Sequence, residues 1–201
     1  IDLGYDTGAL DDYVPTANIS DVTQLSLGNK NISDLTGIED FTALKVLFLQ
    51  NNTSLTTYDF SHNVNLENLS VANTGISTID LSSNIALKYL DIPQNNFSSL
   101  DISKNTLLET LNIAYNSFTS IDISNNLAID NLDFSHNELS NINLSNHTAL
   151  KYLYLNNNQF TEIDLSVNNL LEELSVSNNP NLTTLNVKNG NNTAISDYDS
   201  T

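Results

Sequence analysis

Apolar residues recur along this chain at an almost constant interval. Each recurrence opens a unit, and two intervals of 22 residues are followed by five of 21. The opening positions are Val22, Leu44, Leu66, Leu87, Leu108, Ile129, Leu150 and Leu171. Nearly the whole chain is therefore one unit written eight times, which is typical of a protein built from stacked repeats.

Each unit begins with the pattern L-x-x-L-x-L-x-x-N-x-Φ, where Φ is apolar. Two apolar residues separated by one polar residue predict a short strand with one buried face. The fourth position is leucine in every unit: Leu25, Leu47, Leu69, Leu90, Leu111, Leu132, Leu153 and Leu174. The ninth position is usually Asn, whose amide can bond backbone donors and acceptors where the strand turns. We therefore expect a ladder of Asn side chains with a structural role.

The second half of many units repeats an apolar-polar-apolar signal, as in Ile79-Asp80-Leu81-Ser82. A further Asn follows it at Asn84, Asn105, Asn126 and Asn168, and His147 takes that place in one unit. Because Ile and Val favour strands and the segment is too short for a useful helix, this half predicts a second strand.

Together these patterns resemble the leucine-rich repeat, over roughly residues 22–189. The nested half-units look like the irregular 21-residue class of bacterial leucine-rich repeats. The first unit resembles an internalin-type repeat with a short 3₁₀ turn on its back. The expected fold is a β-rich solenoid of about eight coils, with a parallel front sheet and a second parallel sheet on the back that begins at Tyr58-Asp59-Phe60. A horseshoe with helices on its back is the alternative.

Three segments are expected along the chain. Residues 1–21 do not fit the repeat and predict an N-terminal cap, truncated at its start; residues 22–189 form the solenoid, and residues 190–201 form a tail or partial repeat. The first residue is Ile, which suggests a trimmed or mature chain. The resemblance implies an exported bacterial protein, either secreted or on the cell surface.

Composition narrows the classes of partner. Six basic residues stand against 24 acidic ones, for a net charge of −18, which argues against nucleic acids and anionic membranes. No apolar run approaches the ~20 residues of a membrane span. The chain has no cysteine, so it has neither disulfides nor a thiolate nucleophile. No hydrolase, zinc or phosphate-loop motif is present, and we expect a monomer that is not an enzyme.

The outward side chains of the front strands form the first candidate site. Strand alternation places two residues of each front strand on its outer face. Exposed aromatic rings there are typical of interfaces and sugar-binding surfaces, although tyrosines can also stack across strands to stabilise a sheet. In related leucine-rich repeat proteins the front sheet is the usual ligand face. The candidate ligand-binding residues are Phe48, Tyr89, Asp91, Tyr115, Asp133, His136, Tyr152 and Tyr154.

A column of aspartates on the back forms the second candidate. Four successive units place Asp59, Asp80, Asp101 and Asp122 about 5 Å apart, and serines two residues later can donate hydrogen bonds to them. A solvated ladder is the expected state, and a Ca²⁺-binding stripe is the alternative because Ca²⁺ prefers several oxygen ligands. No other cofactor is expected.

The sequence thus favours a binding module that recognises an extracellular protein or polysaccharide through its front sheet. The alternative is a rigid spacer within a larger cell-surface protein. The clustered tyrosines favour binding, whereas the missing C-terminal cap favours the spacer.

Overall fold

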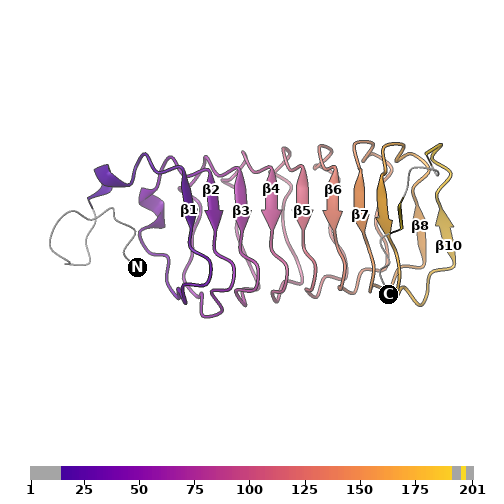
Figure 1. Ribbon diagram of the computed structural model, residues 1–201, viewed down its shortest axis with the longest axis horizontal. Coiled ribbons are helices and arrows are strands. Elements are labelled where there is room, and N and C mark those ends of the chain that lie inside the picture. The colour runs from indigo at the N-terminus through magenta and orange to yellow at the C-terminus, as the bar shows by residue number, and fades with distance from the viewer. Residues whose placement is uncertain (1–14, 192–195, 198–201) are drawn as a thin grey trace.

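The computed structural model describes residues 15–191 and 196–197. Its strands are short, and they run parallel to one another within each of two sheets (Figure 1). The predicted N-terminal cap at 1–21 lies mostly outside these residues; its described part contains η1 (Thr16–Asn18). Nine strands form the front sheet: β1 (Gln24–Ser26), β2 (Val46–Phe48), β3 (Asn68–Ser70), β4 (Tyr89–Asp91), β5 (Thr110–Asn112), β6 (Asn131–Asp133), β7 (Tyr152–Tyr154), β9 (Glu173–Ser175) and β11 (Ser196–Asp197).

Register in this sheet follows the repeat. Each central leucine pairs with the next, as Leu90 does with Leu111 and Leu111 with Leu132. Because side chains alternate along a strand, this register buries every central leucine and turns its two neighbours outward. Leu111 is fully buried, while Thr110 and Asn112 are half-buried on the outer face. The predicted parallel front sheet is confirmed.

Apolar side chains from both halves of the coils meet in one continuous core. Phenylalanines are its largest buried side chains, and the rings of Phe97 and Phe118 stack with centroids 6.5 Å apart. The back contributes Leu81, Ile102 and Ile123, all buried. The solenoid therefore buries its repeat residues along its whole length, with each coil packed on its neighbours.

The back sheet is smaller than the sequence suggested. It pairs β8 (Glu162–Asp164) with β10 (Thr184–Asn186), and the described residues add one bridge, between Asp34 and Thr57. The expectation of back strands from Tyr58-Asp59-Phe60 onward is wrong for the intervening coils. The apolar-polar alternation in these coils predicts only which side chains are buried. A β-ladder also requires the backbone N–H and C=O groups of adjacent coils to lie within hydrogen-bonding distance. The predicted 3₁₀ turn of the first coil is present as η2 (Ile38–Asp40).

Asn columns line both turns, as predicted. In the front column, Asn158 donates to three backbone oxygens, and its Oδ1 accepts from the Leu139 N–H at 2.9 Å. In the back column, Asn126 donates to Ile102 O and Asn105 O. His147 replaces Asn there, is 1% exposed, and places Nε2 3.2 Å from Ile123 O. These side chains satisfy the carbonyls that the turns leave unpaired.

Candidate binding surface

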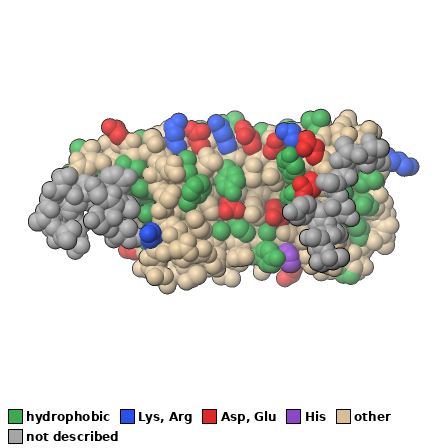
Figure 2. All heavy atoms as spheres, viewed as in Figure 1, with side chains coloured by type: hydrophobic (Ala, Val, Ile, Leu, Met, Phe, Trp, Pro, Cys, Tyr) green, Lys and Arg blue, Asp and Glu red, His purple; other side chains and the backbone are tan. Residues whose placement is uncertain are grey.

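The outward residues of the front strands, here called the front face, include most of the predicted site. Phe48 lies on β2, Tyr89 on β4, and both Tyr152 and Tyr154 on β7; all four are half-buried. Figure 2 shows hydrophobic and acidic side chains side by side over the middle of this face. Strand register fixes these positions, so the aromatic rings are outward because the leucines between them are inward.

The structure brings some of these residues together and separates others. Asp133 pairs with Tyr154 across β6 and β7, whereas Tyr89 is separated from Tyr152 by β5 and β6. At a strand spacing of about 4.8 Å, Tyr89 and Tyr152 lie roughly 14 Å apart. Phe48 is two strands from Tyr89. The predicted residues therefore share one face but form a dispersed surface rather than a closed pocket.

Asp91 is held by its neighbours on the same face. Its Oδ2 accepts from Ser70 Oγ at 2.7 Å, and its Oδ1 accepts from Asn112 Nδ2 at 2.9 Å. Burial raises the pKa of this carboxyl, while the two donors oppose the rise and the charge of Asp133 adds to it. Asp91 thus links β3, β4 and β5, and both its oxygens already have a partner.

Asp133 and Tyr152 have local partners as well. Asp133 Oδ1 accepts from the backbone N–H and the hydroxyl of Ser135, at 3.0 and 2.6 Å. The Tyr152 hydroxyl donates to Glu172 Oε2 at 3.1 Å, and this bond raises the pKa of the tyrosine. Burial also raises the pKa of Tyr89, with a further contribution from Asp91. All these phenols are therefore neutral donors at neutral pH.

Tyr115 and His136 lie just beyond the strands and stack on each other. Their ring centroids are 3.8 Å apart with the planes 12° from parallel. His136 Nε2 lies 3.1 Å from Asn157 Nδ2 of the next coil. Tyr115 is 49% exposed, so one face of this aromatic pair is open to solvent. The sequence placed both residues beside the front face, but the stack itself depends on coil spacing.

Both residues belong to a column in the left-handed backbone region. It is the eighth position of every unit: Asn29, Asn51, Asn73, Gln94, Tyr115, His136, Asn157 and Asn178, with φ between 51° and 62°. Asn adopts this conformation at low cost, whereas Tyr does so rarely. Sequence reasoning missed this column, although the recurrence of Asn at the eighth position was a usable signal. It also missed Glu172 and Asn157 as partners of site residues.

The aspartate column on the back makes local hydrogen bonds. Asp59, Asp80, Asp101 and Asp122 are exposed, and each Oδ1 accepts from the backbone N–H of the serine two residues later, at 2.8–2.9 Å. These bonds lower the pKa of each carboxyl. Within residues 15–191 and 196–197, no three His, Asp or Glu side chains are arranged to hold a metal ion. The column is thus a series of Asx turns.

The chain is similar to bacterial leucine-rich repeat proteins of known structure. The internalin InlF from Listeria monocytogenes has 25% identity and a TM-score of 0.73, over 92% of this chain and 63% of that one. A leucine-rich repeat protein of Leptospira interrogans has 21% identity and a TM-score of 0.71, over 87% and 56%. YopM, a leucine-rich effector protein from Yersinia pestis, has 22% identity and a TM-score of 0.68, over 83% and 49%. The chain spans about half to three-fifths of the length of these proteins.

Curated proteins provide no significant sequence match. Within the described part of the chain, no helix has the length and apolar character needed to cross a membrane. The profile of one protein family, described as the leucine-rich repeat domain of the endo-β-N-acetylglucosaminidase EndoS, matches residues 17–137, which is more than half of the 201 residues. With its repeat, its parallel front sheet and this match, the chain belongs to the family of EndoS-type leucine-rich repeat domains.

Proposed function

We propose that this chain is a non-enzymatic binding module that recognises a protein partner outside the cell through its front face and the adjoining Tyr115–His136 pair. Leucine-rich repeat domains are protein-interaction modules, and the similar solved structures share this solenoid. The front face supplies what such interfaces use, namely half-buried tyrosines with polar tips beside carboxylates.

One observation supports this proposal above the others: the conformation of Tyr115. A tyrosine in the left-handed region is strained by about 1–2 kcal/mol, yet its ring is half exposed rather than packed in the core. Six of the eight coils place Asn or Gln at this position. Backbone strain retained at an exposed position is characteristic of functional sites. The stack on His136 also fixes the Tyr115 ring, so that less conformational entropy is lost on binding.

The partner's chemistry follows from that of the surface. Flat tyrosine rings and carboxylates suit Arg and Lys side chains and peptide amides of a protein. A polysaccharide could use the same rings, but the chain has no tryptophan, the largest aromatic platform. We therefore propose a protein with a basic surface, rather than a polysaccharide, as the partner.

Binding to a panel of extracellular proteins and polysaccharides tests the proposal. The variants Tyr115→Ala/His136→Ala and Tyr89→Ala/Tyr152→Ala/Tyr154→Ala should each weaken a protein interaction at least tenfold, as loss of interface tyrosines does. The back variant Asp80→Asn/Asp101→Asn is the matched control and should bind as the wild type does. Loss of binding in the back variant alone would reject the front face. Binding confined to polysaccharides would reject the protein partner.

A spacer is the second candidate function. It is favoured by the family, whose name refers to one domain of an endo-β-N-acetylglucosaminidase, and by the larger size of the similar solved structures. In this reading the rigid solenoid holds other domains of a longer chain apart. Replacing the solenoid in the longer protein by one with fewer coils would then change activity, while the front-face variants would not.

A further inference from the structure

A row of charged side chains runs along one long edge of the solenoid, at the start of the front strands. Its members, here called the charged row, are Lys45, Glu67, Lys88, Glu109, Asp130, Lys151 and Glu172. Figure 2 shows these charges as a line of both signs along the upper edge. Each backbone N–H from Glu67 onward donates to the carbonyl of the previous member at 2.8–2.9 Å, which places the members one coil apart.

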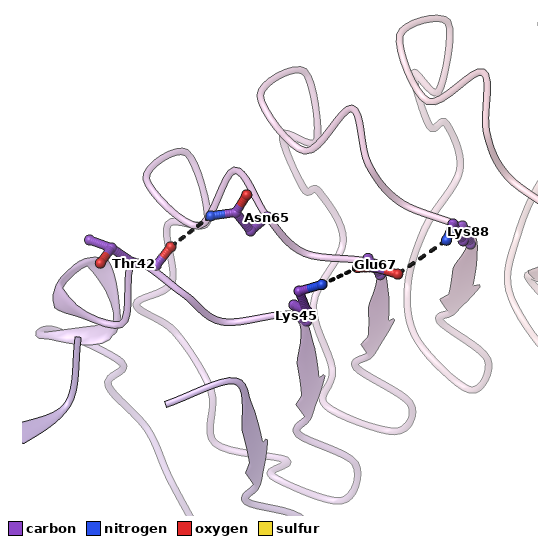
Figure 3. A network of polar contacts seen from close by, with 5 residues as sticks. All are labelled: Thr42, Lys45, Asn65, Glu67 and Lys88. Carbon is purple, nitrogen blue, oxygen red and sulfur yellow. Dashed lines mark hydrogen bonds and ion pairs between the residues drawn. The ribbon is translucent and has the colours of Figure 1, made fainter. Parts of the chain in front are cut away.

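Ion pairs within the row show that neighbouring side chains can reach one another. Glu67 binds both Lys45 and Lys88, at 2.9 and 3.2 Å (Figure 3). Lys151 binds Asp130 at 3.0 Å. The lysine side chains nevertheless stay 40–55% exposed. They therefore remain accessible to a second molecule.

A second row, of exposed apolar side chains, runs beside the first. The turns that precede the front strands carry Val64, Ile85, Leu107, Leu127 and Leu170, which are 49–59% exposed. These turns stack coil on coil, since Asn65 Nδ2 donates to Thr42 O of the previous turn at 2.9 Å (Figure 3). Each member lies two or three residues before a member of the charged row. Exposed apolar side chains rimmed by charge are typical of protein interfaces.

The order of the charges in the charged row is compatible with a second copy of this chain as the partner. Read along the edge, the signs are plus, minus, plus, minus, minus, plus, minus. Under a two-fold axis at Glu109, Lys45 faces Glu172, Glu67 faces Lys151, and Lys88 faces Asp130 of a second copy. Six of the seven members thus face an opposite charge, and Glu109, on the axis itself, faces the Glu109 of the second copy. Strict alternation over seven positions would instead oppose like charges. The break in alternation at Glu109 and Asp130 makes the edge complementary to itself in antiparallel orientation.

The middle of the apolar row fits the same axis, whereas Val64 and Leu170 face turns that carry Thr148 and Thr42 instead of a large apolar residue. Leu107 faces its own copy at the centre, and Ile85 faces Leu127, one coil to either side. The edge also differs from the rest of the surface in charge. It holds three of the chain's six basic residues and has a net charge of −1, against −18 for the whole chain. The charges of two copies therefore add little net repulsion along this edge.

We propose that two copies of this chain associate in antiparallel orientation through the charged and apolar rows, with the two-fold axis at Glu109 and Leu107. Such an interface is isologous, so each opposite-charge pair forms twice. The interface lies along the edge beside the front face and meets it at the hydrogen bond from Tyr152 to Glu172. Leu107→Glu changes neither of these residues, so it tests the dimer separately from the proposed function. The proposed dimer differs from the monomer that the sequence alone suggested.

Sedimentation equilibrium at low salt, over a wide range of protein concentration, tests the dimer. The wild type should show a monomer–dimer equilibrium. Leu107→Glu should raise the dimer Kd roughly tenfold or more, because it places two carboxylates against each other at the axis. Leu185→Glu changes an equally apolar and 40% exposed residue on β10 and is the matched control. A wild type that stays monomeric, or a dimer that Leu107→Glu leaves intact, would overturn the proposal.

A charge exchange tests the orientation. Lys45→Glu and Glu172→Lys should each weaken the dimer, and the double variant should restore it. The two residues are six coils apart in one chain, about 29 Å at 4.8 Å per coil, so restoration can arise only between molecules. Circular dichroism checks that every variant is folded. A double variant weaker than both single ones would contradict the antiparallel register.

Discussion

At the residue scale, the eighth position of the repeat shows how one backbone requirement constrains side chains. The chain turns there through the left-handed region in every coil, and Asn or Gln fills the position six times out of eight. Asn51 and Asn73 also bond each other's side chains at 2.8 Å, which extends the column along the solenoid. Tyr115 departs from this local preference most strongly, and such departures mark functional sites.

Replacement of Tyr115 should separate strain from binding. Tyr115→Asn removes the stack on His136 but relieves the left-handed strain, so the free energy of unfolding should change by less than about 0.5 kcal/mol. Tyr115→Ala keeps most of the strain and loses the stack, and should cost about 1 kcal/mol. Urea denaturation measures both. Equal losses in the two variants would show that strain contributes nothing.

His147 should make stability depend on pH. Burial lowers the pKa of its imidazole in the folded chain, against the hydrogen bond to Ile123 O. Its Nδ1 has no hydrogen-bond partner among the described residues. The unfolded chain therefore binds a proton, at its ordinary pKa near 6.5, before the folded chain does. Stability should fall as pH drops below about 6.5, by at most ~1.4 kcal/mol per pH unit.

Thermal denaturation between pH 7 and pH 5 measures this effect. His147→Asn restores the residue that the other back turns use and should flatten the pH profile in that window. His62→Asn removes an exposed histidine and is the matched control, with the wild-type profile expected. Carboxylates whose pKa is lowered, such as Asp80, lose their contribution only as pH falls below about 4, so the two windows are distinct.

At the scale of elements, the two Asn columns differ in how completely they are bonded. Front Asn158 uses its oxygen for the Leu139 N–H, whereas the Oδ1 of back Asn126 is buried without a hydrogen-bond partner among the described residues. The same holds for Asn63, Asn84, Asn105 and Asn168. The front Asn side chains thus bond both N–H and C=O groups of the backbone, whereas the back Asn side chains bond only C=O groups.

Alanine substitution should reveal that difference. Asn158 and Asn126 are both at most 1% exposed, so Asn158→Ala and Asn126→Ala remove equal side chains from equal burial. Asn158→Ala also leaves the Leu139 N–H unpaired, and should cost about 1–3 kcal/mol more than Asn126→Ala. Chemical denaturation compares the two. A larger loss for Asn126→Ala would mean that the back column, rather than the front column, fixes the stacking of the coils.

At the scale of the whole molecule, the solenoid is long and its charge is strongly negative (Figure 1). The core runs the full length, so each coil depends on its neighbours and stability propagates along the stack. A charge of −18 on this framework opposes the folded state through repulsion between carboxylates. The three ion pairs of the charged row offset only part of that repulsion.

Salt should therefore stabilise the folded chain. Raising ionic strength from about 0.01 to 0.15 M shortens the screening length from about 30 to 8 Å, which weakens repulsion between carboxylates several coils apart. The thermal midpoint should rise with sodium chloride, measured at low protein concentration so that self-association does not contribute. A falling midpoint would show that the ion pairs outweigh the repulsion.

The extent of successful prediction differs between the fold and the site. The eight coils, the front sheet, the Asn ladders and the place of His147 follow from period and residue type, because each coil repeats one local solution. The back sheet was predicted too large, since the alternation at Ile79-Asp80-Leu81 fixes burial but not hydrogen bonding between coils. The candidate residues on strands lie on the outer face, as alternation predicted, but the sequence did not predict that Ser70 and Asn112 would bond Asp91.

The sequence by itself determined the solenoid, its register and which side chains point outward, because the period of the leucines leaves one way to bury them all. The tertiary structure decided which residues of different coils meet. It alone set the Tyr115–His136 stack, the ion pairs of the charged row and the extent of the back sheet, because these depend on the offset between coils and on backbone dihedral angles. Contacts between coils depend on the three-dimensional offset of one coil from the next, whereas burial within a coil depends only on the order of apolar and polar residues.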